Sequence, residues 1–166
     1  MDVDEAIRAR RTLKVFTPET IDRDVVRELL ALAVLAPNHH ETEPWRFWVL
    51  GPETIAKLAG ATGDQKLLRS QTAIAVGVVR NDDPAVAEED YAAVACALEN
   101  LMLAARGRGL ASFWRTPGVL DRPSFAGTLG IPPEVRPIGV LHLGHPGEAF
   151  PDTPARNAEP FTTWLP

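Results

Sequence analysis

The chain has few of the features that tie a protein to export, a membrane or nucleic acid. Only one of its 166 residues is a cysteine, Cys96, so no intrachain disulfide can form, and we expect Cys96 to fill space in a core helix of a protein in a reducing compartment. No apolar run approaches the ~18 residues that span a bilayer, and the N-terminus MDVDEAIRARR lacks the apolar stretch of an export signal. A formal net charge of -5 provides no basic field for phosphate backbones. We therefore expect a cytoplasmic protein with neither a membrane nor a nucleic acid as partner.

The familiar motifs of hydrolytic and nucleotide chemistry are also missing. There is no HExxH helix, no CxxC pair, no GxSxG turn and no P-loop. The pair Gly107 and Gly109 precedes an expected strand instead of following one, so it predicts the end of a helix and not a dinucleotide fingerprint.

What the chain does have is alternating helical and strand patterning over a length that suits one domain, residues 1–166. Apolar residues at steps of three and four predict a short helix over 2–10 and a second helix from Thr20 or Asp22 to about Ala36. A third, of one or two turns, follows Pro52, a long alanine-rich helix covers 85–108, and RPSFAGTLGIP forms a brief one. Strands are predicted over 47–50, 73–79, 110–115 and 138–144. Helices between strands indicate a three-layer α+β or α/β protein.

A polar loop between Pro37 and Pro44 carries the densest chemistry. Both prolines disfavour helix, so the loop is bounded by an apolar helix before it and an apolar strand after it. It contains His39, His40, Glu41 and Glu43. His39, His40 and Glu43 are of the types that bind zinc, although no further ligand motif completes a site. Two glutamates two residues apart can serve as acid and base, or simply be solvated.

Two cationic segments are further candidates. Arg10, Arg11, Thr12 and Lys14 follow the first helix, where arginine forks could hold phosphate oxygens or merely oppose the helix dipole. Trp114, Arg115 and Thr116 stand at the end of a predicted strand, a place where ligands gather; the alternative is a buried tryptophan beside an arginine that reaches water.

In their order along the chain, these segments resemble the nitroreductase-like family of FMN-dependent enzymes. ARRTLKVF is similar to its R-R-S-x-x-x-F box, LAPNHHETEPWRFWVL to its A-P-S-x-x-N-x-Q-P-W loop, and LASFWRTP to the strand after its central helix. The short, minimal members (NAD(P)H nitroreductases) are the most similar, because they have a W-R-S triplet there and a P-F-x-x-[YW] tail like Pro160, Phe161 and Trp164.

The resemblance implies an α+β fold with three layers, α/β/α, in which helices flank a mixed, mainly antiparallel sheet and an extended C-terminal tail crosses to the partner of a homodimer. It also implies FMN held between the subunits, NADH or NADPH as electron donor, and a small-molecule acceptor such as a nitroaromatic or a quinone. No catalytic side chain and no metal are needed, because the flavin carries the hydride. Two alternatives stay open: a flavin-binding sensor with little turnover, and a small metal-dependent hydrolase using His39, His40 and Glu43.

Carried onto this sequence, the family's cofactor contacts fall on nine residues. Arg10, Arg11 and Thr12 would hold the phosphate and ribityl chain, and Lys14 would face the flavin N1 and O2 edge. His39 would reach FMN from the other subunit. Trp114, Arg115 and Thr116 would complete the phosphate side, and Leu35 occupies a position where similar short members have an arginine.

Two departures from the family concern charge. Glu41 stands where many members have an asparagine that meets the flavin, and Glu43 replaces the usual glutamine before Pro-Trp. Either carboxylate, if ionised beside the ring, would oppose negative charge on the reduced flavin. The sequence therefore predicts an unusual potential or acceptor range.

Overall fold

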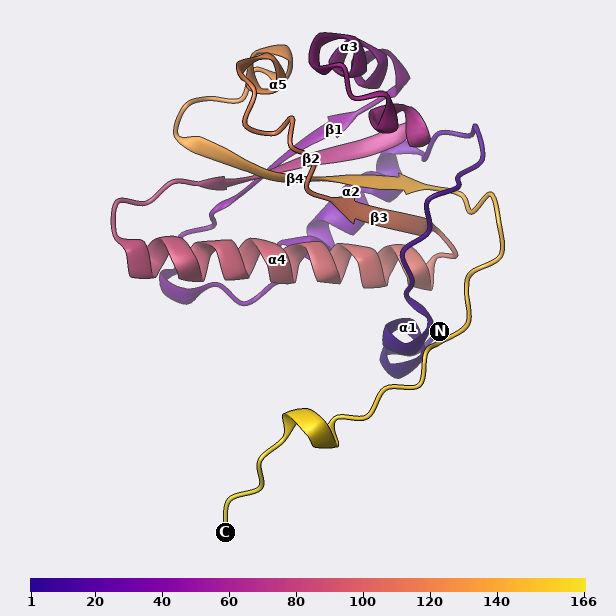
Figure 1. Cartoon of the computed structure of the whole chain (residues 1–166), viewed down its shortest axis with the longest axis vertical. Coiled ribbons are helices and arrows are strands. Elements are labelled where there is room, and N and C mark those ends of the chain that lie inside the picture. The colour runs from indigo at the N-terminus through magenta and orange to yellow at the C-terminus, as the bar shows by residue number, and fades with distance from the viewer.

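The computed structural model describes residues 1–166, and four antiparallel strands form its centre (Figure 1). They are β1 (Trp45–Leu50), β2 (Thr72–Val79), β3 (Ala111–Arg115) and β4 (Val135–Gly144). Their order in the sheet is β1-β2-β4-β3, and each neighbouring pair is antiparallel. The two central strands, β2 and β4, are buried along most of their length, as their runs of apolar residues predict.

Helices cover both faces of this sheet (Figure 1). On one face α2 (Arg23–Ala33) packs with α4 (Pro84–Gly107), and their core side chains include Leu29, Leu98 and Leu101. On the other face α3 (Pro52–Thr62) and α5 (Pro123–Leu129) enclose a second core with Leu58 and Phe125. The short α1 (Val3–Ala9) lies against α4, and 3-10 turns cover His39–Glu41, Gln65–Arg69 and Glu159–Phe161. The expected three-layer α+β arrangement is confirmed.

Several sequence-based details need correction. The second helix ends at Ala33, short of Ala36, because a turn and a bend take over before Pro37; Asp22 caps its start. The third helix runs for 11 residues, about three turns at ~3.6 residues per turn, since the glycine that ends it is Gly63 and not Gly60. Cys96 is exposed on α4 instead of filling the core, because it lies on the helix face turned away from the sheet.

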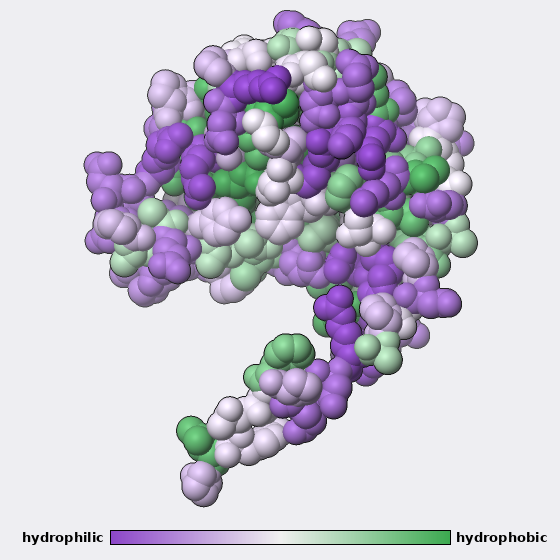
Figure 2. Space-filling model, viewed as in Figure 1, coloured by the Kyte–Doolittle hydropathy of each residue, from purple (hydrophilic) through white to green (hydrophobic).

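The C-terminal tail leaves the body of this chain as an extended segment (Figure 1). Figure 2 shows it standing clear of the rest, with hydrophobic atoms at two places along it. Phe161, Trp164 and Leu165 are 90%, 79% and 84% exposed. Within the single chain these apolar side chains therefore remain uncovered. No helix combines the length and the apolar character that a membrane crossing requires.

The absence of a side chain at Gly139 lets Trp114 on β3 pack closely against β4. A Cβ added at Gly139 on β4 would stand 2.2 Å from the indole Nε1 of Trp114 and 3.1 Å from the carbonyl oxygen of Arg115. Both of these atoms belong to β3, so the missing side chain lets the tryptophan approach the β4 backbone closely.

We expect Gly139→Ala to destabilise the protein, because the added methyl group must displace Trp114. Overpacking of this kind costs about 1–3 kcal/mol in the free energy of unfolding. Gly60→Ala on α3 is the matched control: nothing lies within 4 Å of its added Cβ, and alanine in a helix should stabilise by roughly 0.5–1 kcal/mol. Urea unfolding of both variants measures the difference, and equal effects would contradict the close-approach argument.

Candidate functional site

A hollow of about 830 Å³ lies between the end of α1 and the start of the tail. We call it the arginine hollow, because four arginines line it. Its residues are Ile7, Arg8, Arg10, Arg11, Thr12, Pro151, Thr153, Pro154, Ala155 and Arg156. Guanidinium groups and hydroxyls in this density suit an anionic ligand such as a phosphate.

The N-terminal wall of the hollow is fixed by local sequence signals. Asp2 and Glu5 form a reciprocal capping box at the start of α1, and the helix ends at Arg10, whose backbone is extended. Thr12 then forms a parallel bridge with Ser112, and the amide of Leu13 donates to the Ser112 carbonyl at 3.2 Å. The chain after α1 therefore runs along the outer edge of β3.

The arginines in this wall differ in how far they are already neutralised. Arg10 Nε lies 3.1 Å from a carboxylate oxygen of Glu99 on α4. Arg11 has no carboxylate partner; it donates to the backbone carbonyls of Arg10 and, at 3.5 Å, of Asp152. Thr153 ties the tail to α1, since its hydroxyl donates to the Arg8 carbonyl at 2.7 Å. Arg11 is therefore the more available cation.

Lys14 and Arg115 lie farther along β3, outside the lining of the hollow. The Lys14 ammonium stands 5.3 Å from the centre of the Phe113 ring, and the Arg69 guanidinium lies 5.7 Å from it. Arg115 Nη2 donates to Asp64 at 2.7 Å, and the two side chains are only 13% and 11% exposed. The charge of Arg115 is thus paired within the chain, not snorkelling into water.

The other strand-end candidates have different surroundings. Trp114 points to the opposite face of β3 and packs against the core under α4, and its indole N–H has no hydrogen-bond partner. Thr116 is exposed. Leu35 is 74% exposed and borders a separate hollow with Val3, Leu32 and Leu103.

His39 and its loop lie elsewhere, against the N-terminal half of α4. His39 Nδ1 is 2.8 Å from Glu89, whereas Arg10 pairs with Glu99, ten residues later on the same helix. At ~1.5 Å per residue, this separates the loop from the arginine hollow by about 15 Å along α4. His39 and the arginines therefore lie well apart within a single chain.

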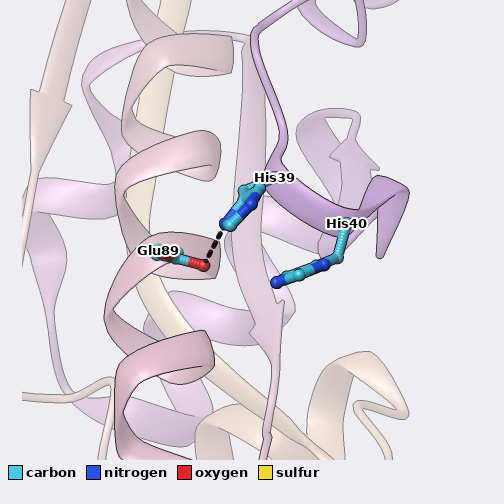
Figure 3. Close-up of side chains that lie close together, drawn as sticks. All are labelled: His39, His40 and Glu89. Carbon is cyan, nitrogen blue, oxygen red and sulfur yellow. Dashed lines mark hydrogen bonds and ion pairs between the residues drawn. The ribbon is translucent and has the colours of Figure 1, made fainter.

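The structure also changes the possible metal ligands. His39, His40 and Glu89 lie together, and Glu89 takes the place that the sequence assigned to Glu43 (Figure 3). Glu43 does not belong to this group. Its backbone N–H donates to the Asn38 side-chain oxygen at 2.7 Å. Glu89 lies 50 positions from His39, so no local motif could have indicated it.

A buried histidine completes the polar groups near β3. The hydroxyl of Ser70 donates to the Thr72 carbonyl at 2.7 Å, so it accepts from His142 Nδ1 at 2.9 Å, and His142 Nε2 has no partner. Burial, and then the positive charges of Arg115 and Arg69, lower the pKa of His142 to about 4. His142 is therefore neutral at physiological pH.

Sequence reasoning thus found Arg10, Arg11 and Thr12 in one hollow but missed its remaining polar residues. Arg8, Thr153 and Arg156 join them, and the last two come from the tail. The tail sequence PDTPARN does carry a hydroxyl and a cation, a weak signal that was available.

The fold and the arginine hollow define a class: an α+β protein with a site suited to an anionic ligand at the sheet edge. The model of the family described as "Nitroreductase family" matches residues 7–82 and 64–145, so the chain belongs to the nitroreductase family. The predicted resemblance is confirmed.

Individual relatives agree over most of their length. A protein of Archaeoglobus fulgidus, provisionally named an NADH dehydrogenase/NAD(P)H nitroreductase, is 31% identical over 150 residues, 84% of this chain and 83% of its own. The nitroreductase-like family protein of Bacillus cereus superposes with a TM-score of 0.90 at 26% identity, covering 99% and 96% of the two chains. A provisionally named nitroreductase of Desulfovibrio desulfuricans, solved in complex with FMN, has the same fold with a TM-score of 0.83 at 22% identity over 100% and 98%.

We expect the stability of the protein to fall as the pH drops from about 6.5 to about 4. In this window a histidine in the unfolded chain takes up a proton, whereas folded His142 stays neutral, so acid favours the unfolded state by up to about 3 kcal/mol. His142→Phe removes the titrating group and should flatten this part of the profile. Urea unfolding at pH 7, 6 and 5 measures both proteins, and identical pH slopes would rule the explanation out.

Proposed function

We propose that the protein is an FMN-dependent NAD(P)H oxidoreductase that works as a homodimer in the cytoplasm. The observation that carries this proposal is the arginine hollow, which stands beside the sheet edge of a nitroreductase-family chain. The FMN complex of the Desulfovibrio desulfuricans relative supports it.

The polar end of FMN fits the residues present. A phosphate needs charged donors, and Arg10, Arg11 and Thr12 line a hollow of about 830 Å³, within the range of ordinary ligand pockets. Arg8 and Arg156 add charge from the two sides. Thr116 follows β3 at the end away from the Thr12–Ser112 bridge, beyond Lys14, so it would contact the cofactor outside this hollow. Arg115, paired with Asp64, and Trp114, packed in the core, would act by holding that strand end in place.

This chain alone supplies only part of a binding site for the ring of FMN. Lys14, exposed above Phe113, would face the N1 and O2 edge of the bound ring. A cation there stabilises negative charge on the reduced ring and raises its potential. No aromatic side chain lines the hollow, so the ring would need a stacking wall from outside this chain.

A second copy of the chain would supply that wall. Val3, Ile7 and Leu35 are 71%, 54% and 74% exposed around α1 and α2, and the apolar tail is uncovered as well. Large apolar groups gathered in this way mark a protein interface. Since His39 is about 15 Å along α4 from the arginines of its own chain, it would meet the flavin bound to the partner.

The chemistry supplied by bound FMN is hydride transfer in ping-pong order, from NADH or NADPH to N5 and on to a nitroaromatic, a quinone or a related acceptor. The side chains of this protein bind and orient; we assign none of them as a catalytic residue. Arg10, Arg11 and Thr12 hold the phosphate, Lys14 sets the charge beside the ring, and the second subunit excludes water.

A flavin-binding protein with little turnover is the second candidate. Glu41 and Glu43 are exposed on the loop that would face the partner's flavin. Negative charge there would disfavour reduction of the ring. This candidate predicts bound FMN that neither nicotinamide reduces.

We expect the purified protein to be yellow or to bind added FMN, and its flavin absorption to bleach under NADH or NADPH without oxygen. Arg11→Ala should weaken FMN binding at least about tenfold, because a charged hydrogen bond contributes roughly 1.5–3 kcal/mol. Arg27→Ala, which removes an exposed cation paired with Asp24 on α2, is the control. Fluorescence titration of FMN measures all three proteins. A colourless protein that does not bind added FMN would refute the proposal. Bound flavin that neither nicotinamide reduces would favour the second candidate.

We expect sedimentation to show a dimer and the double variant Phe161→Ala, Trp164→Ala to weaken it. Buried aromatic anchors commonly contribute about 2 kcal/mol or more each, which is over tenfold in the dissociation constant. FMN affinity should fall with the dimer. Val49→Thr, at another exposed apolar position on the edge strand β1, should leave both unchanged. A monomer with full FMN affinity would refute the shared site.

A further inference from the structure

Two imidazoles and one carboxylate meet on the outer surface of α4 (Figure 3). His39 Nδ1 is 2.8 Å from the Glu89 carboxylate, and the rings of His39 and His40 stack with their centres 3.8 Å apart. One nitrogen or oxygen from each of the three residues lies within 4.8 Å of the others. All three side chains are exposed to solvent.

The backbone of the loop brings the two histidines to the same side. Neighbouring side chains normally diverge, but His40 adopts φ 60° and ψ 6°, a left-handed conformation that turns its ring back toward His39. Such a conformation costs an ordinary residue about 1–2 kcal/mol, and it persists where the surroundings fix it.

Side-chain hydrogen bonds fix it here. Thr42 donates to Asp90, the buried neighbour of Glu89, and accepts from the Asn38 amide at 3.0 Å. The Asn38 oxygen in turn accepts from the Glu43 amide at 2.7 Å. Since Asp90 is occupied by Thr42, Glu89 is the carboxylate left facing the imidazoles. The three donors are thus set by the loop and α4 together.

We propose that His39, His40 and Glu89 bind a divalent transition-metal ion of the zinc class. Two imidazole nitrogens and one carboxylate oxygen form the three-ligand set of an open tetrahedral zinc site, with water in the fourth position. Imidazole donors favour Zn²⁺, Ni²⁺ or Cu²⁺ over Mg²⁺ and Ca²⁺, which prefer oxygen ligands alone. Within the single chain the three groups are exposed to an incoming ion.

The movement needed to close the site is small. Zinc bonds of about 2.0–2.2 Å place neighbouring tetrahedral ligand atoms about 3.3 Å apart, against the present limit of 4.8 Å. Rotation of the exposed imidazoles about their side-chain bonds brings the nitrogens together without moving α4 or the anchored loop. A bound ion then ties the loop to α4.

A metal ion bound to His39 would compete with the proposed contact between His39 and the partner's flavin. This consequence rests on the proposed function, in which His39 meets the flavin of the partner. A histidine that ligates zinc through the nitrogen now facing Glu89 is held against its own α4, so we expect saturating Zn²⁺ to weaken FMN binding.

Calorimetric titration of untagged, chelator-treated protein with Zn²⁺ tests the site. We expect saturation at one Zn²⁺ per chain, and Co²⁺ in its place to give the visible absorption bands of a tetrahedral ion. Groups outside the ligand sphere alone change metal affinity about 10–100-fold, so His40→Ala and Glu89→Gln should each weaken binding at least about tenfold. Both variants leave the proposed phosphate contacts Arg10, Arg11 and Thr12 unchanged, and both keep His39 itself.

Two controls separate this site from scattered surface binding. Glu88→Gln removes the adjacent carboxylate on α4, and Glu43→Gln removes one of the two carboxylates on the loop; both should bind Zn²⁺ as the wild type does. Absence of saturable binding, or unchanged affinity in Glu89→Gln, would overturn the proposal. Failure to bind FMN would instead refute the proposed function, because the zinc titration needs no flavin.

Discussion

The backbone contact between Thr12 and Ser112 is the constraint on which the candidate site depends. It attaches the segment after α1 to the outer edge of β3, and the buried Leu13 secures it with its amide bond to Ser112. Because this segment lies parallel to the strand, Arg11 comes to face the start of the tail while Lys14 reaches Phe113. A few backbone atoms therefore set both ends of the site.

The two faces of the sheet have different characters. Under α4 and α2 the core is apolar, and only the indole N–H of Trp114 is left without a partner there. On the other face, two buried polar pairs join η2 (Gln65–Arg69) and its flanking residues to the strands. Asp64 pairs with Arg115 on β3, and Ser70 pairs with His142 on β4. Buried polar groups must keep their hydrogen-bond partners, so these two pairs fix how η2 packs against the strands.

Helix and strand patterning was enough to predict the layers, because α4 and the buried strands β2 and β4 have long, uniform signals. The motif order likewise predicted the family and the three N-terminal residues of the arginine hollow. Partners brought together by tertiary folding were out of reach: Asp64 is 51 positions from Arg115, and Glu89 is 50 from His39. The end of α2 was misjudged because the turn at Val34 precedes the proline that the sequence makes visible. The single domain and the nine cofactor contacts stay predictions.

The left-handed backbone at His40, Glu41 and Glu43 limits which sequences this loop can accept. Glycine, asparagine, aspartate and histidine enter that region most readily, whereas branched side chains such as valine, isoleucine and threonine clash with their own backbone. Variation in nature or in a mutant library should therefore alter the charge and hydrogen bonding of the loop far more readily than its bulk. The loop can be retuned chemically while its path stays the same.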